Sequence, residues 1–200
     1  MKKPERISIG LRAKTARAIA VVLGGSSESP AVLKKFEIPL ADPRVPDTFQ
    51  PYHVVMELPW KDSQTAVKKS VRAIETIARK AIANLIDELA EAKMKVAGIG
   101  IVGARDRDPG RIGNYHIRAH AAEGLLFRRV LDLAAEANKI EYRTFPEQDF
   151  EAILAAELGA GKTALKRKIN ELGKGLAPPW RTDEKQAATA AWLILHRGPR

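Results

Sequence analysis

Two histidines and a glutamate are spaced so that one face of a helix would carry all three side chains. His116, His120 and Glu123 lie at positions i, i+4 and i+7 of a segment with helical periodicity. Imidazole and carboxylate groups on one helical face are typical of a divalent metal site or of acid–base catalysis. His53, one of four histidines in the chain, is a further candidate for this group. The alternative is a solvated first helical turn in which Glu123 pairs with a neighbouring side chain.

A second acidic pair, Asp183 and Glu184, begins the last segment with helical periodicity. These carboxylates are candidates for cation binding or acid–base catalysis. The alternative is that they stabilise the helix N-terminus, where Asp183 and Gln186 have the spacing of a capping box. From both groups together we predict that the catalytic residues are His120, Glu123, Asp183 and Glu184. We predict that the metal ligands are His116, His120, Glu123 and Asp183.

Basic residues form two groups, and the formal net charge of the chain is +10. Such a charge favours a polyanionic partner such as nucleic acid, because phosphates attract clustered lysines and arginines. The alternative for each group is a solvated surface without a partner. The first group comprises Lys68, Lys69, Arg72, Arg79 and Lys80, near the start of a segment with helical periodicity. The second group comprises Lys166, Arg167, Lys168, Lys174 and Arg181.

An alternation of strands and helices must position these residues. Alternating or continuous apolar residues predict strands over 7–12, 16–23, 32–40, 95–104 and 140–144. Apolar residues three or four apart predict helices over 62–92, 115–137, 147–158, 162–173 and 183–196. The order predicts an α/β fold: a mixed five-stranded sheet, three antiparallel strands followed by two parallel ones, with helices on both faces. The proline-rich segment 41–61 is expected to be an irregular insertion, and Pro39 is suited to an edge strand.

Length and composition favour a single domain over residues 1–200. The hydrophobic fraction of 45% is enough for a sizeable core. The chain contains no cysteine, which excludes disulfides and thiolate metal ligands. No run of about 18 apolar residues predicts a membrane span, and the N-terminal residues lack the apolar run of a signal peptide. We therefore expect a cytoplasmic protein.

The order of elements resembles that of the ribonuclease H-like superfamily, and most closely its RuvC-type resolvase branch. The opening segment Ile7-Ser8-Ile9-Gly10-Leu11-Arg12 resembles the first strand of that branch, in which an acidic residue is followed closely by glycine. Asp183-Glu184-Lys185-Gln186-Ala187-Ala188 resembles the acidic, alanine-rich start of its last helix. The resemblance implies a nuclease site whose carboxylates, on the first strand, near the end of the fourth and at the last helix, hold two Mg²⁺ or Mn²⁺ ions.

This sequence departs from the acidic pattern of that branch. No Asp or Glu occurs from residue 7 to residue 23, so Ser8 or Gly10 stands where the acid is expected. The fourth strand contains no acid either, although Asp106 and Asp108 follow it. We therefore predict a nucleic-acid-associated domain without the usual two-metal centre. The alternatives are a metal-dependent nuclease or other hydrolase with a relocated acidic and histidine site, and a structural module that binds a protein partner.

Overall fold

Three consecutive antiparallel strands begin the chain. The computed structural model describes residues 5–159 and 161–197. These strands are β1 (Glu5–Lys14), β2 (Arg17–Gly25) and β3 (Pro30–Pro39), and each pairs with the next. Apolar side chains alternate along β1: Ile7, Ile9 and Leu11 are fully buried on one face of the sheet.

Two further strands extend the sheet in parallel. β4 (Met94–Gly103) pairs with β1, and β5 (Tyr142–Pro146) pairs with β4. The strand order is β3-β2-β1-β4-β5, so β1 and β4 are central and β3 is an edge strand, as Pro39 indicates. The predicted mixed sheet is confirmed.

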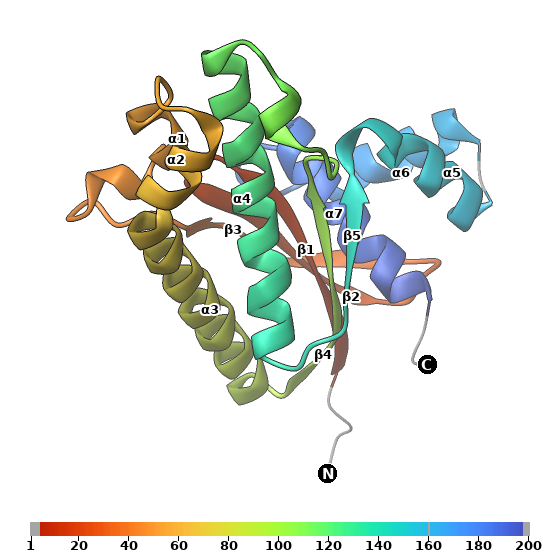
Figure 1. Ribbon diagram of the computed structural model, residues 1–200. Helices are drawn as coiled ribbons and strands as arrows, with labels where there is room; N and C mark the ends of the chain where they lie inside the picture. Colours follow the sequence, from red (N-terminus) through yellow and green to blue (C-terminus); the bar gives the residue numbers. More distant parts are fainter. Residues whose placement is uncertain (1–4, 160, 198–200) are drawn as a thin grey trace.

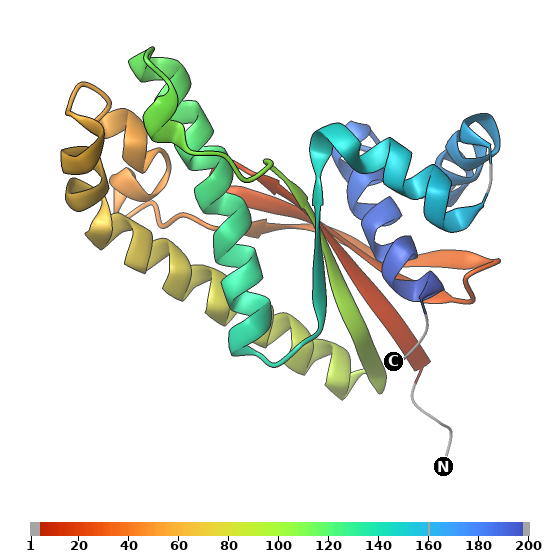
Figure 2. The same cartoon turned by 45° about the vertical axis from the view of Figure 1, so that its right-hand side comes forward.

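Helices cover both faces of this sheet (Figures 1 and 2). α3 (Lys68–Glu91) and α4 (Tyr115–Ala137) pack on the face that carries Ile9 and Leu11. On the opposite face lie α5 (Phe150–Leu158), α6 (Lys162–Leu172) and α7 (Thr182–His196). Two hydrophobic clusters result, one under each layer of helices. None of the helices in the described part of the chain is long and apolar enough to cross a membrane.

The segment between β3 and α3 differs from the prediction. Residues 41–61, expected to be irregular, contain the short helices η1 (Pro46–Thr48) and α1 (Pro51–Val54) and the start of α2 (Trp60–Ala66). Prolines begin η1 and α1, because proline tolerates the first helical position, where no backbone N–H is needed. The single helix predicted over 62–92 is divided at Val67, which separates α2 from α3. Val67 is itself buried, so the apolar periodicity continues across the break and conceals it.

Candidate functional site

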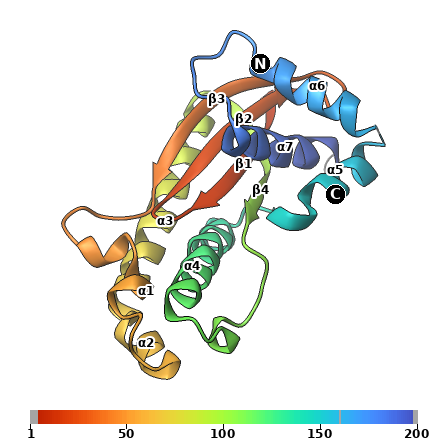
Figure 3. The same ribbon diagram turned by 90° about the horizontal axis from the view of Figure 1, so that it is seen from above.

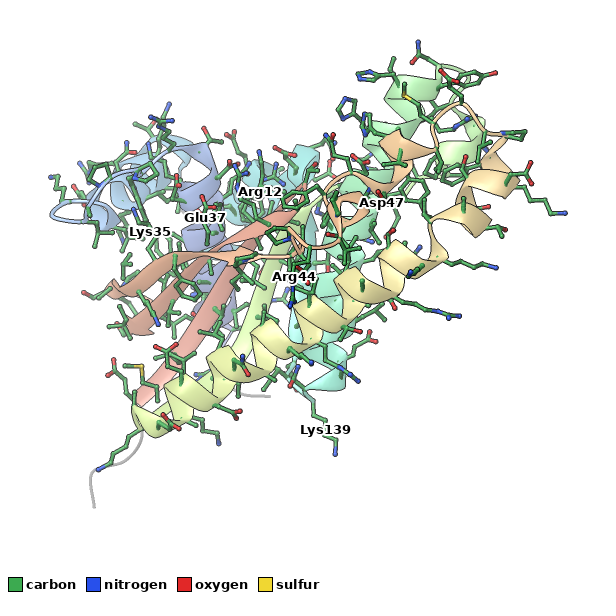
Figure 4. The ribbon with its side chains drawn as sticks, turned by 90° about the vertical axis from the view of Figure 1, so that its left-hand side faces the viewer. Arg12, Lys35, Glu37, Arg44, Asp47 and Lys139 are labelled. Atoms are coloured by element: carbon green, nitrogen blue, oxygen red, sulfur yellow. The ribbon has the colours of Figure 1, made fainter. Side chains whose placement is uncertain are left out.

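A cluster of charged side chains lies where the parallel strands end. Arg12 is near the carboxyl end of β1, Glu147 follows β5, and Asp183 is in the first turn of α7. The Arg12 Nη2 lies 2.6 Å from the Glu147 Oε1, and its Nε lies 3.5 Å from the Asp183 Oδ1. Only 7% of the Arg12 side chain is exposed. Figure 4 shows Arg12 at this end of the sheet.

Lys14 adds a second cation to this cluster, which we call the Arg12 cluster. Its Nζ lies 3.2 Å from the Asp183 Oδ2 and donates a hydrogen bond to the Oδ1. Two cations therefore face two carboxylates, and their formal charges cancel. Carboxyl ends of parallel strands are where α/β proteins commonly bind ligands. Mg²⁺ and Mn²⁺, however, require carboxylate oxygens that are free to coordinate. At this edge the Arg12 guanidinium pairs with both carboxylates.

Ser8 and Gly10, where the sequence led us to expect an acid, lie under α7. Ser8 is fully buried, and its Oγ has no hydrogen-bond partner among the residues that the structure describes. A Cβ on Gly10 would lie 1.8 Å from the carbonyl oxygen of Ala187. The backbone of α7 thus crosses β1 in direct contact at Gly10, which leaves no room for a side chain at that position. Arg12 is the next residue of β1 on this face and lies at its open end.

The acids that follow β4 have structural partners. Asp106 accepts hydrogen bonds from the Nη1 and Nη2 of the buried Arg128, at 3.1 and 2.7 Å. These bonds hold the pKa of Asp106 below its ordinary value. Asp108 caps the short helix η2 (Pro109–Arg111) by accepting from the Gly110 N–H at 2.9 Å. Both acids that follow β4 therefore have partners within the chain.

Glu184 caps the last helix, and the predicted capping pair of Asp183 and Gln186 is wrong. The Glu184 Oε2 accepts a hydrogen bond from the backbone N–H of Arg181 at 2.7 Å, because α7 begins one residue earlier than expected. Glu184 is buried. Asp183 instead points to β1, where Arg12 and Lys14 bind it.

The histidines form a second candidate site on the other side of the sheet. His116 and His120 lie one turn apart on α4, and their ring centroids are 4.5 Å apart. His53, from α1, brings its ring to 4.4 Å from His120 and 5.2 Å from His116. The His53 Nδ1 lies 2.8 Å from the Oε1 of Glu123, whose side chain is 1% exposed. His53 thus contacts Glu123 as well as the rings of His116 and His120.

A local helix cap and two hydrogen bonds between distant segments hold the elements that carry the histidines. The Asn114 side chain caps α4 by accepting from the Ile117 N–H. The guanidinium of Arg118, which is buried, donates from its Nη2 to the carbonyl oxygens of Met56 and Leu58, at 3.2 and 3.0 Å. These bonds hold the chain that follows α1 against α4 (Figure 3).

Asp183 does not join the histidines. It lies with α7 on one face of the sheet, whereas α4 packs on the other. Asp183 is therefore too far from His116, His120 and Glu123 to complete the four-residue metal site that we predicted. The predicted catalytic residues also lie on two faces of the sheet, with His120 and Glu123 on α4 and Asp183 and Glu184 on α7. Sequence reasoning also missed Arg12, Lys14 and Glu147 as members of a charged cluster. The signal was present, because Arg12 is a charged residue in an otherwise apolar and small alternating strand.

The two basic groups lie on opposite faces of the molecule. The first follows α3 and is exposed; the ion pairs of the described residues include none of Lys68, Lys69, Arg72, Arg79 and Lys80. The second, around α6, is partly occupied by internal contacts. The Lys168 Nζ lies 5.7 Å from the centre of the Trp192 ring, and the Arg167 Nε lies 4.0 Å from Glu171.

The strand order, the parallel β1–β4–β5 unit and the helix α7 across β1 define a ribonuclease H-like fold. Among solved structures, the chain is similar to T. thermophilus RuvC in complex with a Holliday junction substrate, with a TM-score of 0.51 and 11% identity. The similarity covers 94% of this chain and 91% of RuvC. A second T. thermophilus RuvC structure matches 94% of this chain and 92% of its own at 12% identity, with a TM-score of 0.48. No family model and no curated protein sequence matches the chain. The predicted fold is confirmed, including its likeness to RuvC.

Proposed function

We propose that this protein binds nucleic acid through α3 and lacks a two-metal nuclease centre. The observation that carries the proposal is the exposed row of lysines and arginines on α3, which we call the α3 row: Lys68, Lys69, Arg72, Arg79 and Lys80. The first turn of α3 contains no acidic residue. Positive charge at a helix N-terminus opposes the helix dipole, so an external anion would stabilise this arrangement.

The length of the α3 row suits a phosphate backbone. Lys68 and Lys80 are 12 residues apart, which corresponds to about 18 Å along the helix axis at 1.5 Å per residue. That length spans roughly five phosphates of one strand of a duplex at 3.4 Å each. The solved RuvC structure with a Holliday junction supports a nucleic-acid partner for a fold of this kind. The net charge of +10 supports it independently.

The Arg12 cluster supports the absence of the usual nuclease chemistry. Its carboxylates, Asp183 and Glu147, pair with cations of the chain itself, and Glu184 caps a helix. A two-metal mechanism would need these groups to hold ions that activate water. We therefore expect binding without cleavage in the presence of Mg²⁺ or Mn²⁺.

A titration at several salt concentrations tests the binding surface. Fluorescence anisotropy would follow labelled four-way junctions, duplex DNA, single-stranded DNA and RNA. The affinity should fall linearly with salt on logarithmic axes, because binding releases counterions. Replacing Lys68, Lys69 and Arg72 by glutamine should reduce the magnitude of the slope of log affinity against log salt concentration by up to about three, because each lost phosphate contact removes about one.

A matched variant separates a specific surface from net charge. Replacing Lys166, Arg167 and Lys174 by glutamine removes the same charge from the opposite face. The proposal expects this control to bind more tightly than the α3 variant. Equal loss in both variants would contradict the assignment to α3, and no binding of any nucleic acid at low salt would end the proposal and favour a protein-binding module.

A nuclease assay tests the second half of the proposal. The same substrates incubated with Mg²⁺ or Mn²⁺ should remain intact. Cleavage that disappears in Asp183→Asn would instead favour the metal-dependent hydrolase.

A further inference from the structure

We infer that His53, His116 and His120 bind a divalent transition-metal ion, with Zn²⁺ the best match, and that Glu123 orients His53 for this role. One ligand nitrogen from each histidine lies within 4.8 Å of the other two. Three of the four histidines of the chain therefore meet at one point, although His53 is 63 residues from His116 in sequence. The inference is independent of nucleic-acid binding and concerns the opposite side of the sheet from Asp183.

The contact between Glu123 and His53 fixes which nitrogen faces the site. The Nδ1 of His53 lies 2.8 Å from the Glu123 Oε1, so this nitrogen carries the proton that it donates. The same oxygen accepts the backbone N–H of His53 at 3.2 Å. The Nε2 of a neutral His53 then presents a lone pair to the cluster. Metal-binding histidines commonly have such a carboxylate behind them, which fixes the tautomer and increases the basicity of the ring.

Two buried polar atoms at this site have no partner among the described residues. They are the His53 Nε2 and the Glu123 Oε2. Protonation of His53 would not satisfy its Nε2, because that nitrogen would become a donor without an acceptor. A buried atom of either kind is costly unless something binds it. A metal ion coordinated by the Nε2 would satisfy it in its neutral form.

The charge of Glu123 leads to the same conclusion. Its side chain is 1% exposed, and the ion pairs of the described residues give it no lysine or arginine partner. An isolated buried carboxylate is unfavourable without a nearby positive charge. A dication held by His53 would lie directly across the imidazole ring and supply that charge.

The distances allow the site to close around an ion. Ligand nitrogens in a tetrahedral zinc site with Zn–N bonds of about 2.0–2.1 Å are about 3.3 Å apart. His116 and His120 are exposed on α4, so rotation of their side chains can shorten the present spacing. His53 is held by Glu123 and serves as the fixed ligand. Three histidines leave a fourth position for water or another ligand, the arrangement that zinc adopts in catalytic rather than structural sites.

The ligand types select among metals. Imidazole nitrogens suit Zn²⁺, Cu²⁺, Ni²⁺ and Fe²⁺, whereas Mg²⁺ and Ca²⁺ prefer oxygen ligands. We therefore expect the cluster to distinguish Zn²⁺ from Mg²⁺, which separates it from any nuclease-type metal centre.

Isothermal titration calorimetry with ZnCl₂ and the untagged, full-length protein tests the inference. We expect one Zn²⁺ per chain and no binding of Mg²⁺. His116→Ala and His120→Ala should each weaken the affinity at least 100-fold and should keep the fold, because both side chains are exposed. His196→Ala is the matched control, since this histidine lies at the end of α7, outside the cluster, and its loss should leave the affinity unchanged.

Glu123→Gln tests the orienting role separately. The amide oxygen can still accept from the His53 Nδ1 but carries no charge, so we expect affinity to fall by 10- to 100-fold. Substitution with Co²⁺ provides a spectroscopic readout, because its visible absorption reports coordination by the histidines. Zinc binding that persists in both His116→Ala and His120→Ala, or that is lost in His196→Ala, would overturn the site. Unchanged affinity in Glu123→Gln would overturn the role assigned to the carboxylate.

Discussion

The contact between β1 and α7 at Gly10 predicts a large effect of adding a single methyl group. A Cβ at this position would lie 1.8 Å from the Ala187 carbonyl oxygen and 2.7 Å from the Ala191 nitrogen. Both atoms belong to the backbone of α7, which cannot rotate out of the way as a side chain can. Gly10→Ala would therefore move the whole helix away from the sheet.

The size of the effect follows from two opposing contributions. Overpacking a buried contact costs up to about 3 kcal/mol, and the upper end applies here because the helix must move by more than about 1 Å. Replacing glycine reduces the conformational freedom of the unfolded chain and returns about 0.4–1 kcal/mol. The net loss in the free energy of unfolding is about 2 kcal/mol, or about 4–8 °C in Tm for a domain of this length.

Urea and thermal unfolding, followed by circular dichroism, measure this difference. Gly124→Ala in α4 is the matched control, because its Cβ would meet Ala104 at 3.4 Å, an acceptable contact. Alanine there should stabilise the helix by up to about 1 kcal/mol. A Gly10→Ala variant as stable as the wild type would refute the close contact between α7 and β1.

Two ion-pair and hydrogen-bond contacts give predictions that depend on pH. The Arg143 and Arg197 guanidiniums hold the pKa of Glu157 below its ordinary value, so their stabilising effect is present at neutral pH and is lost as the pH falls through that lowered pKa. Glu157→Gln should be less stable than the wild type by about 1 kcal/mol at neutral pH, and this difference should disappear as the pH falls through the lowered pKa; a deficit that is the same at every pH would contradict the ion pair. The hydrogen bond to Glu136 raises the pKa of Tyr142 to about 12. Glu136→Gln should therefore show nearly one additional phenolate at about pH 11 by ultraviolet difference spectroscopy, and an unchanged spectrum would argue against this bond.

The sequence predicted the secondary structure best where one periodicity persists through a whole element. The helix expected over 115–137 has those bounds in α4, and the apolar run of 95–104 corresponds to the interior strand β4. The prediction failed at Val67, where two helices share an uninterrupted apolar stripe. Hydrophobic periodicity reports which side chains are buried, and Val67 is buried in the break as it would be in a helix.

The sequence indicates which of the candidate residues are neighbours on one helix. His116, His120 and Glu123 share a face because the spacing along α4 determines it. The addition of His53 depended on the packing of α1 against α4, which no local pattern specifies. The exclusion of Asp183 likewise depended on which face of the sheet α7 covers.

The sequence by itself determined that no acid occurs from residue 7 to residue 23, and hence that a usual two-metal centre is not expected. The tertiary structure decided what stands in its place. Strand ends and the start of α7 converge from distant parts of the chain, so Arg12 meets Glu147 and Asp183 only after folding. The physical reason is that β-strand alternation decides which face a side chain occupies, whereas packing between elements decides which charges it meets there.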